Sequence, residues 1–276
     1  MDKIILLLIL FSFPVIFIYF RKQRKLKRRA VLLETEFPKA WEAILEERMP
    51  LYRRMPVELR EQLRRHIKIF LSEKSFEGCK GQKIDDKVRV VIAAYACMLL
   101  LNRETDYYPD LTSILVYPDA YWVNDEFHVG GGQTIKSKAV NLGESWENGV
   151  VVLSWKQIED ELSDEKCGQS LVIHEFAHQI DAEDGFLNGL PELGEGSSYG
   201  QWAKVFAREY EGLKEGGGDG DGIIDDYGSR DPAEFFSVVT EGFFLMAPEM
   251  KARHPELYSE LMKFYKVDPS QWNWSY

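Results

Sequence analysis

The residues best suited to do chemistry lie at positions 172–179, which contain a His-Glu-x-x-His pattern. In a helix, residues four apart lie one turn apart on the same face, so His174 and His178 can present two imidazoles to one ion. Glu175 then lies beside them, where its carboxylate can take a proton from a water at the metal. Two neutral imidazoles with an oxygen ligand suit zinc, which lowers the pKa of such a water to ~7. The pattern predicts a zinc hydrolase site with Glu175 as the catalytic base.

The segment around this pattern is apolar, which argues against an ordinary charged surface helix. Residues 171–173 are Leu-Val-Ile, and Phe176, Ala177 and Ile180 lie within or just after the pattern. Such a helix is expected to be mostly buried. Two histidines and a glutamate on a buried helix need polar partners, and a metal ion supplies them.

A catalytic zinc site needs a third protein ligand and one open position, and the sequence offers three candidates. Asp181 shares the helical face of the histidines, but its short side chain is better placed to hydrogen-bond a ligand imidazole. Asp184 would be the ligand if the chain turned sharply after His178, as in zinc peptidases with His-Glu-x-x-His-x-x-Gly-x-x-His/Asp. That turn requires glycine, and Asp181 stands in its place. The third candidate is Glu234.

Glu234 lies in a second predicted helix with clear start signals. Asp231 can cap this helix, and Pro232 suits its first position. The neighbouring Phe235 and Phe236 indicate that Glu234 lies close to the core. A buried carboxylate without a partner is costly, and coordination to zinc would resolve that cost. We therefore predict Glu234 as the third ligand.

Residues 174–181 and 231–238, with their separation, resemble the Mlc titration factor A family of zinc peptidases, whose catalytic core is similar to that of anthrax lethal factor. The likeness covers about residues 37–269, nearly the whole chain after its amino-terminal segment. It includes five further segments, at residues 73–78, 91–100, 116–118, 143–146 and 152–155.

The resemblance implies a complete site, with His174, His178 and Glu234 as zinc ligands and Glu175 as the general base. It also implies a role for Tyr227, which lies seven residues before the third ligand. In related sites a tyrosine at this spacing faces the zinc, where its hydroxyl can stabilise the oxyanion of a tetrahedral intermediate. The alternative for Tyr227 is a loop aromatic packed on the surface.

Members that resemble this chain cleave small peptide-like substrates, which implies aminopeptidase-type activity, and some affect sugar uptake by binding the repressor Mlc. We therefore predict a zinc-dependent peptidase that acts on a peptide or protein substrate. The alternative is a zinc-containing regulator that sequesters a transcriptional repressor or another partner, with incidental hydrolysis. Glu175 favours the enzyme, because a structural zinc would not need it and usually has four protein ligands.

The amino-terminal segment predicts a membrane anchor. Residues 4–20 form a 17-residue run without a charge, and seven of the nine residues 21–29 are Lys or Arg. No positive region precedes the run as in a cleaved signal peptide. The positive-inside rule then predicts a single-pass inner-membrane protein whose catalytic domain faces the cytoplasm. Because Pro14 interrupts the run, an interfacial anchor on anionic lipid is the alternative.

Charge and cysteine content narrow the function classes further. The chain has a net charge of −11, and the part after residue 29 contains 26 Lys and Arg against 44 Asp and Glu. So acidic a body argues against nonspecific nucleic-acid binding. Three cysteines, at positions 79, 97 and 167, are too few and too scattered for a disulfide framework, and they suit a reducing compartment.

The predicted elements run from helices through short strands to helices, which is typical of an α+β fold. Besides the two zinc helices, helical periodicity covers residues 37–47, 56–73, 86–101, 198–214 and 255–265. Strand-like runs cover residues 113–117, 120–123, 126–129 and 150–155. We predict a membrane-anchor segment at residues 1–29 and a mostly helical, zincin-like metallopeptidase domain with a small sheet at residues 30–276.

Three further features have open interpretations. The strand at residues 150–155 could pair with an extended substrate or be purely structural. The Gly- and Asp-rich segment 216–226 lacks two important ligands of a calcium loop and is better interpreted as a lid over the cleft. His66 has basic neighbours in the sequence, so we expect it to be solvated.

Overall fold

The computed structural model describes residues 2–119, 126–129, 133–136, 149–164, 168–194, 198–216 and 222–274. The chain divides into two compact units, Met1–Pro38 and Lys39–Tyr276. The first contains one helix, α1, which spans Asp2–Glu34. The second contains the remaining helices and strands.

The predicted membrane anchor is wrong. Across the part of the chain that the structure describes, no helix combines the length and the apolar character needed to cross a membrane. The apolar run at residues 4–20 is at the short end of the ~17–25 residues that span a bilayer, and α1 continues directly into the basic residues 21–29. The predicted single-pass inner-membrane location with a cytoplasm-facing domain therefore fails, and with it the sequence argument for a lipid bilayer as partner.

The unit Lys39–Tyr276 is mostly helical and contains a small parallel sheet, so the predicted α+β class is confirmed. Strands β1 (Ser75–Gly78), β2 (Ser113–Tyr117) and β5 (Val150–Ser154) form a sheet in the order β1-β2-β5. Both pairs are parallel, with Ser75 opposite Ser113 and Ser113 opposite Val150.

A separate antiparallel pair is formed by β3 (Glu126–Val129) and β4 (Gln133–Lys136). The strand predicted at residues 120–123 lies outside the described residues. The other three predicted strands are observed, except that Trp155 begins a helix instead of ending β5.

Most predicted helices occur close to their expected bounds. They are α2 (Lys39–Arg48), α4 (Val57–Glu73), α5 (Asp86–Met98), α8 (Tyr199–Gly216) and α11 (Pro255–Tyr265). Three shorter helices were not predicted, namely α3 (Pro50–Arg54), α6 (Trp155–Ser163) and α10 (Ala247–Arg253). Short helices carry few turns of periodic pattern, which explains why they escaped detection.

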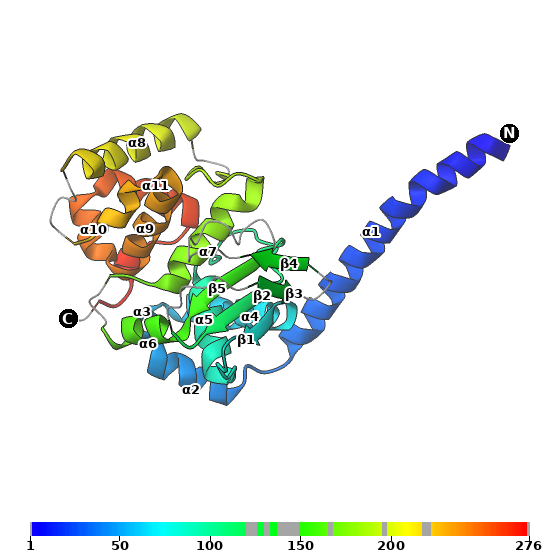
Figure 1. The fold of residues 1–276 in the computed structure, drawn as a ribbon, viewed down its shortest axis with the longest axis horizontal. Coiled ribbons are helices and arrows are strands. Elements are labelled where there is room, and N and C mark those ends of the chain that lie inside the picture. The colour runs from blue at the N-terminus through cyan, green and yellow to red at the C-terminus, as the bar shows by residue number, and fades with distance from the viewer. Residues whose placement is uncertain are drawn as a thin grey trace. The chain divides into compact units, whose positions relative to one another are not determined.

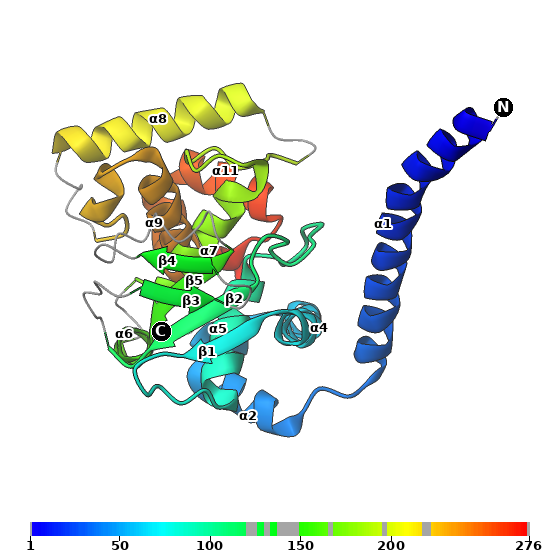
Figure 2. The same ribbon diagram turned by 45° about the vertical axis from the view of Figure 1, so that its right-hand side comes forward.

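The helices that carry the candidate site are α7 (Leu171–Asp181) and α9 (Pro232–Leu245). In both ribbon views α7 lies between the sheet and the carboxy-terminal group of helices α8 to α11 (Figures 1 and 2). On one side, the ring of Phe176 lies 5.7 Å from that of Phe70 and 4.9 Å from that of Tyr108. On the other side, α7 packs against α9.

An aromatic cluster fixes α9 within the carboxy-terminal group. The ring of Trp202 in α8 lies 4.0 Å from that of Phe206 and 5.4 Å from that of Phe264 in α11. Phe236 in α9 contacts the same cluster, with its ring 5.9 Å from that of Phe264. These side chains are buried, and aromatic rings contribute large apolar areas to a core. The aromatic cluster therefore fixes the position of α9, the helix that supplies Glu234.

Candidate metal centre

The helix α7 is buried along its whole length, as its apolar sequence predicts. It begins where the Ser170 hydroxyl accepts a hydrogen bond from the Ile173 amide at 3.3 Å. His174 follows in the first turn and His178 in the next, and their rings lie 4.9 Å apart. The helix thus presents both imidazoles on one buried face.

The helix α9 brings Glu234 to this face. It begins at Asp231, whose carboxylate accepts hydrogen bonds from the amides of Ala233 and Glu234, both at 3.0 Å. The cap places Glu234 in the first turn, where its carboxylate Oε2 lies 2.9 Å from His174 Nε2 and 3.3 Å from His178 Nε2. Residues that lie 56 and 60 positions apart in the sequence therefore meet at one point.

These three side chains could hold a metal ion. One ligand atom from each of His174, His178 and Glu234 lies within 4.8 Å of the others, and among the described residues this is the one group of its kind. Two ligands at ~2.1 Å from one tetrahedral ion lie ~3.4 Å apart, which is close to the observed separations. Two imidazole nitrogens and a carboxylate oxygen suit zinc and several other divalent transition metals. The donor set and its spacing fit such an ion.

The electrostatics of the group are dominated by its carboxylates. Burial alone lowers the pKa of His174, but hydrogen bonds with Glu234 and Glu241 outweigh burial and raise it to about 10. Burial raises the pKa of Glu234, yet its hydrogen bonds with His174 and His178 bring that pKa well below its usual range. Burial lowers the pKa of His178. A cationic occupant is favoured here, because negative charge is concentrated around the imidazoles.

Glu175 lies beside the ligand group and is almost completely buried, with 2% of its surface exposed. Burial is the main cause that raises its pKa to about 8. Its Oε1 atom is buried without a hydrogen-bond partner in the described part of the chain. A carboxyl group whose pKa lies near neutral can both accept and return a proton, which is the property that acid–base catalysis requires.

Tyr227 is brought to the same group by a short 3₁₀ helix, Asp226–Ser229. The Asp225 carboxylate caps this helix by accepting a hydrogen bond from the Tyr227 amide at 2.8 Å. The half-buried phenol then points at the ligands, and its hydroxyl donates to Glu234 Oε1 at 3.3 Å. The Tyr227 ring lies 5.9 Å from the ring of His174. This contact with the ligands differs from that of an aromatic packed on the surface.

Arg230 was not singled out from the sequence, although it lies three residues after Tyr227. Its guanidinium group donates a hydrogen bond to the Tyr227 hydroxyl and lies 4.8 Å from the centre of that ring. A cation that donates to the phenol oxygen makes the phenol proton a better donor. The spacing of three residues within a helical turn is the signal that could have identified Arg230.

The two rejected third ligands have other partners. Asp181 is fully buried and accepts a hydrogen bond from the Gly189 amide at 2.7 Å, so it fixes the loop after α7. This hydrogen bond to the loop is not the hydrogen bond to a ligand imidazole that the sequence predicted for Asp181. Asp184 accepts from the Phe186 amide at 2.9 Å in an exposed turn. Of the segment 216–226, positions 217–221 lie outside the described residues, and the calcium-loop and lid interpretations lie there with them.

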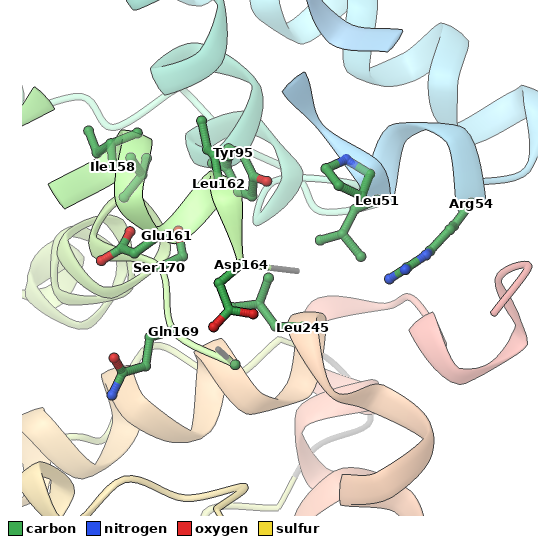
Figure 3. A pocket seen from close by; sticks show the side chains of 13 residues that line it. Leu51, Arg54, Tyr95, Ile158, Glu161, Leu162, Asp164, Gln169, Ser170 and Leu245 are labelled. Carbon is green, nitrogen blue, oxygen red and sulfur yellow. The ribbon is translucent and has the colours of Figure 1, made fainter. Parts of the chain in front are cut away.

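A pocket adjoins the start of α7 (Figure 3). Gln169, Ser170 and Glu161 contribute to one side of it, and Arg54 approaches from the opposite side. None of the three candidate ligands is among its lining residues. This pocket is therefore separate from the metal centre, and it meets α7 only at the residues that begin the helix.

A buried His-Glu-x-x-His helix joined by a carboxylate from a second helix defines the class of metal-dependent peptidases. The chain belongs to the glucose-regulated metallo-peptidase M90 family, whose model matches residues 21–266. The family resemblance inferred from the sequence is thereby confirmed. Because this is a metallopeptidase family, a metal cofactor is expected.

Similar proteins span most of the chain. An uncharacterized protein of Synechocystis is 39% identical over 244 residues, which cover 88% of this chain and 89% of that protein. The Mlc titration factor A of Cronobacter sakazakii is 31% identical over 84% of this chain and 87% of its own length. That of Salmonella arizonae is 31% identical over 73% of this chain and 81% of its own length.

Proposed function

We propose that the protein is a zinc-dependent peptidase with aminopeptidase-like activity on small peptides. One observation carries the proposal: a buried carboxyl group with an orphan oxygen, Glu175, lies next to the converging atoms of His174, His178 and Glu234. Zinc is the metal that best suits two imidazoles and one carboxylate with an open position. We assign the activity to residues 30–276, of which Lys39–Tyr276 form one compact unit.

His174, His178 and Glu234 would hold the ion. When bound, zinc supplies Lewis acidity, which lowers the pKa of a water to ~7 and polarises a carbonyl group. Glu175 takes the proton from the attacking water and returns it to the leaving amine. Its raised pKa suits both steps, because a pKa near 8 makes the carboxylate a stronger base than usual and still allows the acid form to return the proton to the leaving amine.

Tyr227 donates a hydrogen bond to the oxyanion that develops on the scissile carbonyl. Its hydroxyl already lies at the ligand group, 3.3 Å from Glu234 Oε1, so a small rotation redirects the proton to substrate. The hydrogen bond from Arg230 to the same hydroxyl strengthens it as a donor. A preorganised donor of this kind is a major source of transition-state stabilisation in acyl transfer.

The backbone partner that we assign to the substrate is β5. Among the described strands, β5 ends the order of the three-stranded sheet, and its helix neighbour α7 carries the ligands. An extended peptide that adds to the outer edge of β5 would gain main-chain hydrogen bonds. Strand addition of this type fits a peptidase that reads substrate backbone more than side chains.

The test is hydrolysis of a mixed peptide library by the full chain loaded with zinc. Glu175→Gln keeps the shape of the side chain but cannot take up a proton, so cleavage should fall to background while zinc remains bound. Treatment with a chelator should abolish cleavage, and added zinc should restore it. Glu260→Gln, which changes a buried carboxylate on α11 outside the ligand group, is the matched control and should cleave normally. Equal cleavage by wild type and Glu175→Gln would rule out the proposed mechanism.

A second candidate function is a regulator that binds a transcriptional repressor, with hydrolysis incidental. It is favoured by the name of two similar proteins, Mlc titration factor A. The Glu175→Gln variant separates the two functions. A partner effect that survives this substitution indicates binding, and one that disappears while zinc remains bound indicates catalysis.

A further inference from the structure

Glu241 makes two contacts that link the ligand group to the start of α7. It lies on α9 seven residues after Glu234, hence two turns further along the same face. Its Oε1 atom lies 2.8 Å from Nδ1 of His174, and its Oε2 atom accepts a hydrogen bond from the Ser170 amide at 2.6 Å. The side chain is buried, with 7% of its surface exposed. One carboxylate thus contacts both a candidate ligand and the residue that caps its helix.

The contact at Nδ1 determines which nitrogen of His174 would be free to bind a metal. A carboxylate only accepts hydrogen bonds when ionised, so Nδ1 must carry a proton. A neutral imidazole with its proton on Nδ1 has its lone pair on Nε2, and Nε2 is the atom that lies 2.9 Å from Glu234 Oε2. The pairing therefore selects the tautomer that can ligate and turns its lone pair toward Glu234 and His178.

We propose that Glu241 is a positioning residue for the metal ligand His174, fixing both the tautomer and the orientation of its ring. The inference rests on the proposed metal-dependent function. α9 then supplies a ligand at Glu234 and the support of another ligand at Glu241. Glu234 contacts His174 and His178, whereas Glu241 contacts His174 and Ser170. If one helix slid along the other, both sets of contacts would therefore be disturbed.

The competing interpretation is that Glu241 only stabilises the start of α7 through the Ser170 amide. Glu161 provides the control for this interpretation. Its Oε2 atom accepts a hydrogen bond from the next amide, that of Leu171, at 2.9 Å. Glu161 is partly buried, and this burial is the main cause that raises its pKa to about 7. Glu161 thus serves the same helix start, and its Oε1 atom accepts a hydrogen bond from the Gln157 side-chain amide at 3.0 Å.

The experiment measures zinc affinity for full-length wild type, Glu241→Gln and Glu161→Gln by competition with a chromophoric chelator. A glutamine at position 241 has one acceptor oxygen and one donor group, so it cannot accept from both His174 and Ser170. Facing the amide group, His174 would move its proton to Nε2 and lose the ligating lone pair. We expect Glu241→Gln to bind zinc 10- to 100-fold more weakly, which is the usual effect of removing such a partner. Glu161→Gln should stay within about threefold of wild type.

Two further measurements separate positioning from folding. The cobalt-substituted protein should show an altered visible spectrum in Glu241→Gln and an unaltered one in Glu161→Gln, because only the first changes a ligand's orientation. Thermal unfolding without metal checks that both variants fold. If Glu241→Gln does not fold, Glu241→Asp replaces it, since aspartate keeps the charge but draws the carboxylate back from His174 by one methylene.

The outcomes are distinct. Affinity of Glu241→Gln within threefold of wild type, with an unaltered cobalt spectrum, overturns the positioning role but leaves the peptidase proposal standing. Equal weakening in Glu161→Gln also overturns it, because the effect then belongs to the helix start. Absence of zinc binding by the wild type overturns both this inference and the proposed function.

Discussion

Two buried histidines, His66 in α4 and His174 in α7, have opposite electrostatic surroundings. Their exposed fractions are almost the same, 8% and 7%, so burial does not distinguish them. His66 Nδ1 lies 2.9 Å from the neutral hydroxyl of Tyr107, and burial lowers its pKa to about 4. Burial opposes the charge of His174 too, but carboxylates at both ring nitrogens raise its pKa to about 10.

The difference teaches how a structural histidine can be told from a candidate ligand. A desolvated imidazole favours its neutral form unless charged neighbours compensate. At His66 a single hydroxyl satisfies one nitrogen, and the ring then behaves as part of the core. At His174 two buried carboxylates meet one ring, an arrangement that is costly without a positive charge between them. The carboxylates, more than the histidines, mark the metal centre.

The largest expected effect follows from removing the carboxylate that both ligand histidines share. Glu234→Gln replaces an anionic ligand with a neutral amide, so zinc affinity should fall on the order of 10³-fold or more, beyond the effect of a supporting residue. Isothermal titration of the metal-free protein measures this loss, and peptide cleavage should disappear with it. Glu260→Gln again serves as the control. Wild-type zinc affinity in Glu234→Gln would show that the carboxylates do not distinguish His174 from His66.

A smaller effect is expected at the tyrosine beside the ligands. Tyr227→Phe removes the oxyanion donor and keeps the ring, so kcat should fall about 10²- to 10³-fold with little change in KM or zinc content. Tyr210→Phe is the matched control, because within the described part of the chain the Tyr210 hydroxyl donates to the Ser229 carbonyl, at 3.4 Å, and to no candidate ligand. Steady-state kinetics on one cleaved peptide provide the comparison. A similar kcat in both variants would contradict a role for Tyr227 in catalysis.

Much of this centre could be predicted from sequence because its geometry is local. The four-residue spacing of His174 and His178 fixes their common face once a helix forms. The Asp231-Pro232 start of α9 fixes the turn in which Glu234 lies, and the observed cap confirms that start. For α7 and α9 to meet, each helix needs only to bury its polar groups against the other.

Two features of the structure did not follow from the sequence analysis. One depends on tertiary packing, and the other had a sequence signal that was missed. The contact between Glu241 and His174 joins positions 67 apart, so no local pattern encodes it. His66 was expected to be solvated because of its basic neighbours, and this expectation is wrong. Its spacing from Leu63 and Phe70, three before and four after, places it on the buried face of α4. The helical period predicts the burial of His66 correctly, whereas the charges of its sequence neighbours do not.

The smallest expected effect is a pH dependence of stability that originates at His66. Its pKa is lowered in the folded state, from 6.5 to about 4, so the unfolded chain takes up a proton first as the pH falls. The unfolded state then binds more protons than the folded state between these two values, and stability decreases as the pH falls through this window. Well above pH 6.5 both states are neutral at this position and the contribution is constant.

The free energy of unfolding should therefore fall by about 2 kcal/mol between pH 7 and pH 5 because of this one group. His66→Gln keeps a polar partner for the Tyr107 hydroxyl but cannot be protonated, so the variant should lack this component. Chemical unfolding of both proteins at each pH measures it, and subtracting the two curves cancels the other titrating groups. Parallel curves would show that folding leaves the pKa of His66 unchanged, and the contrast with His174 would then not hold.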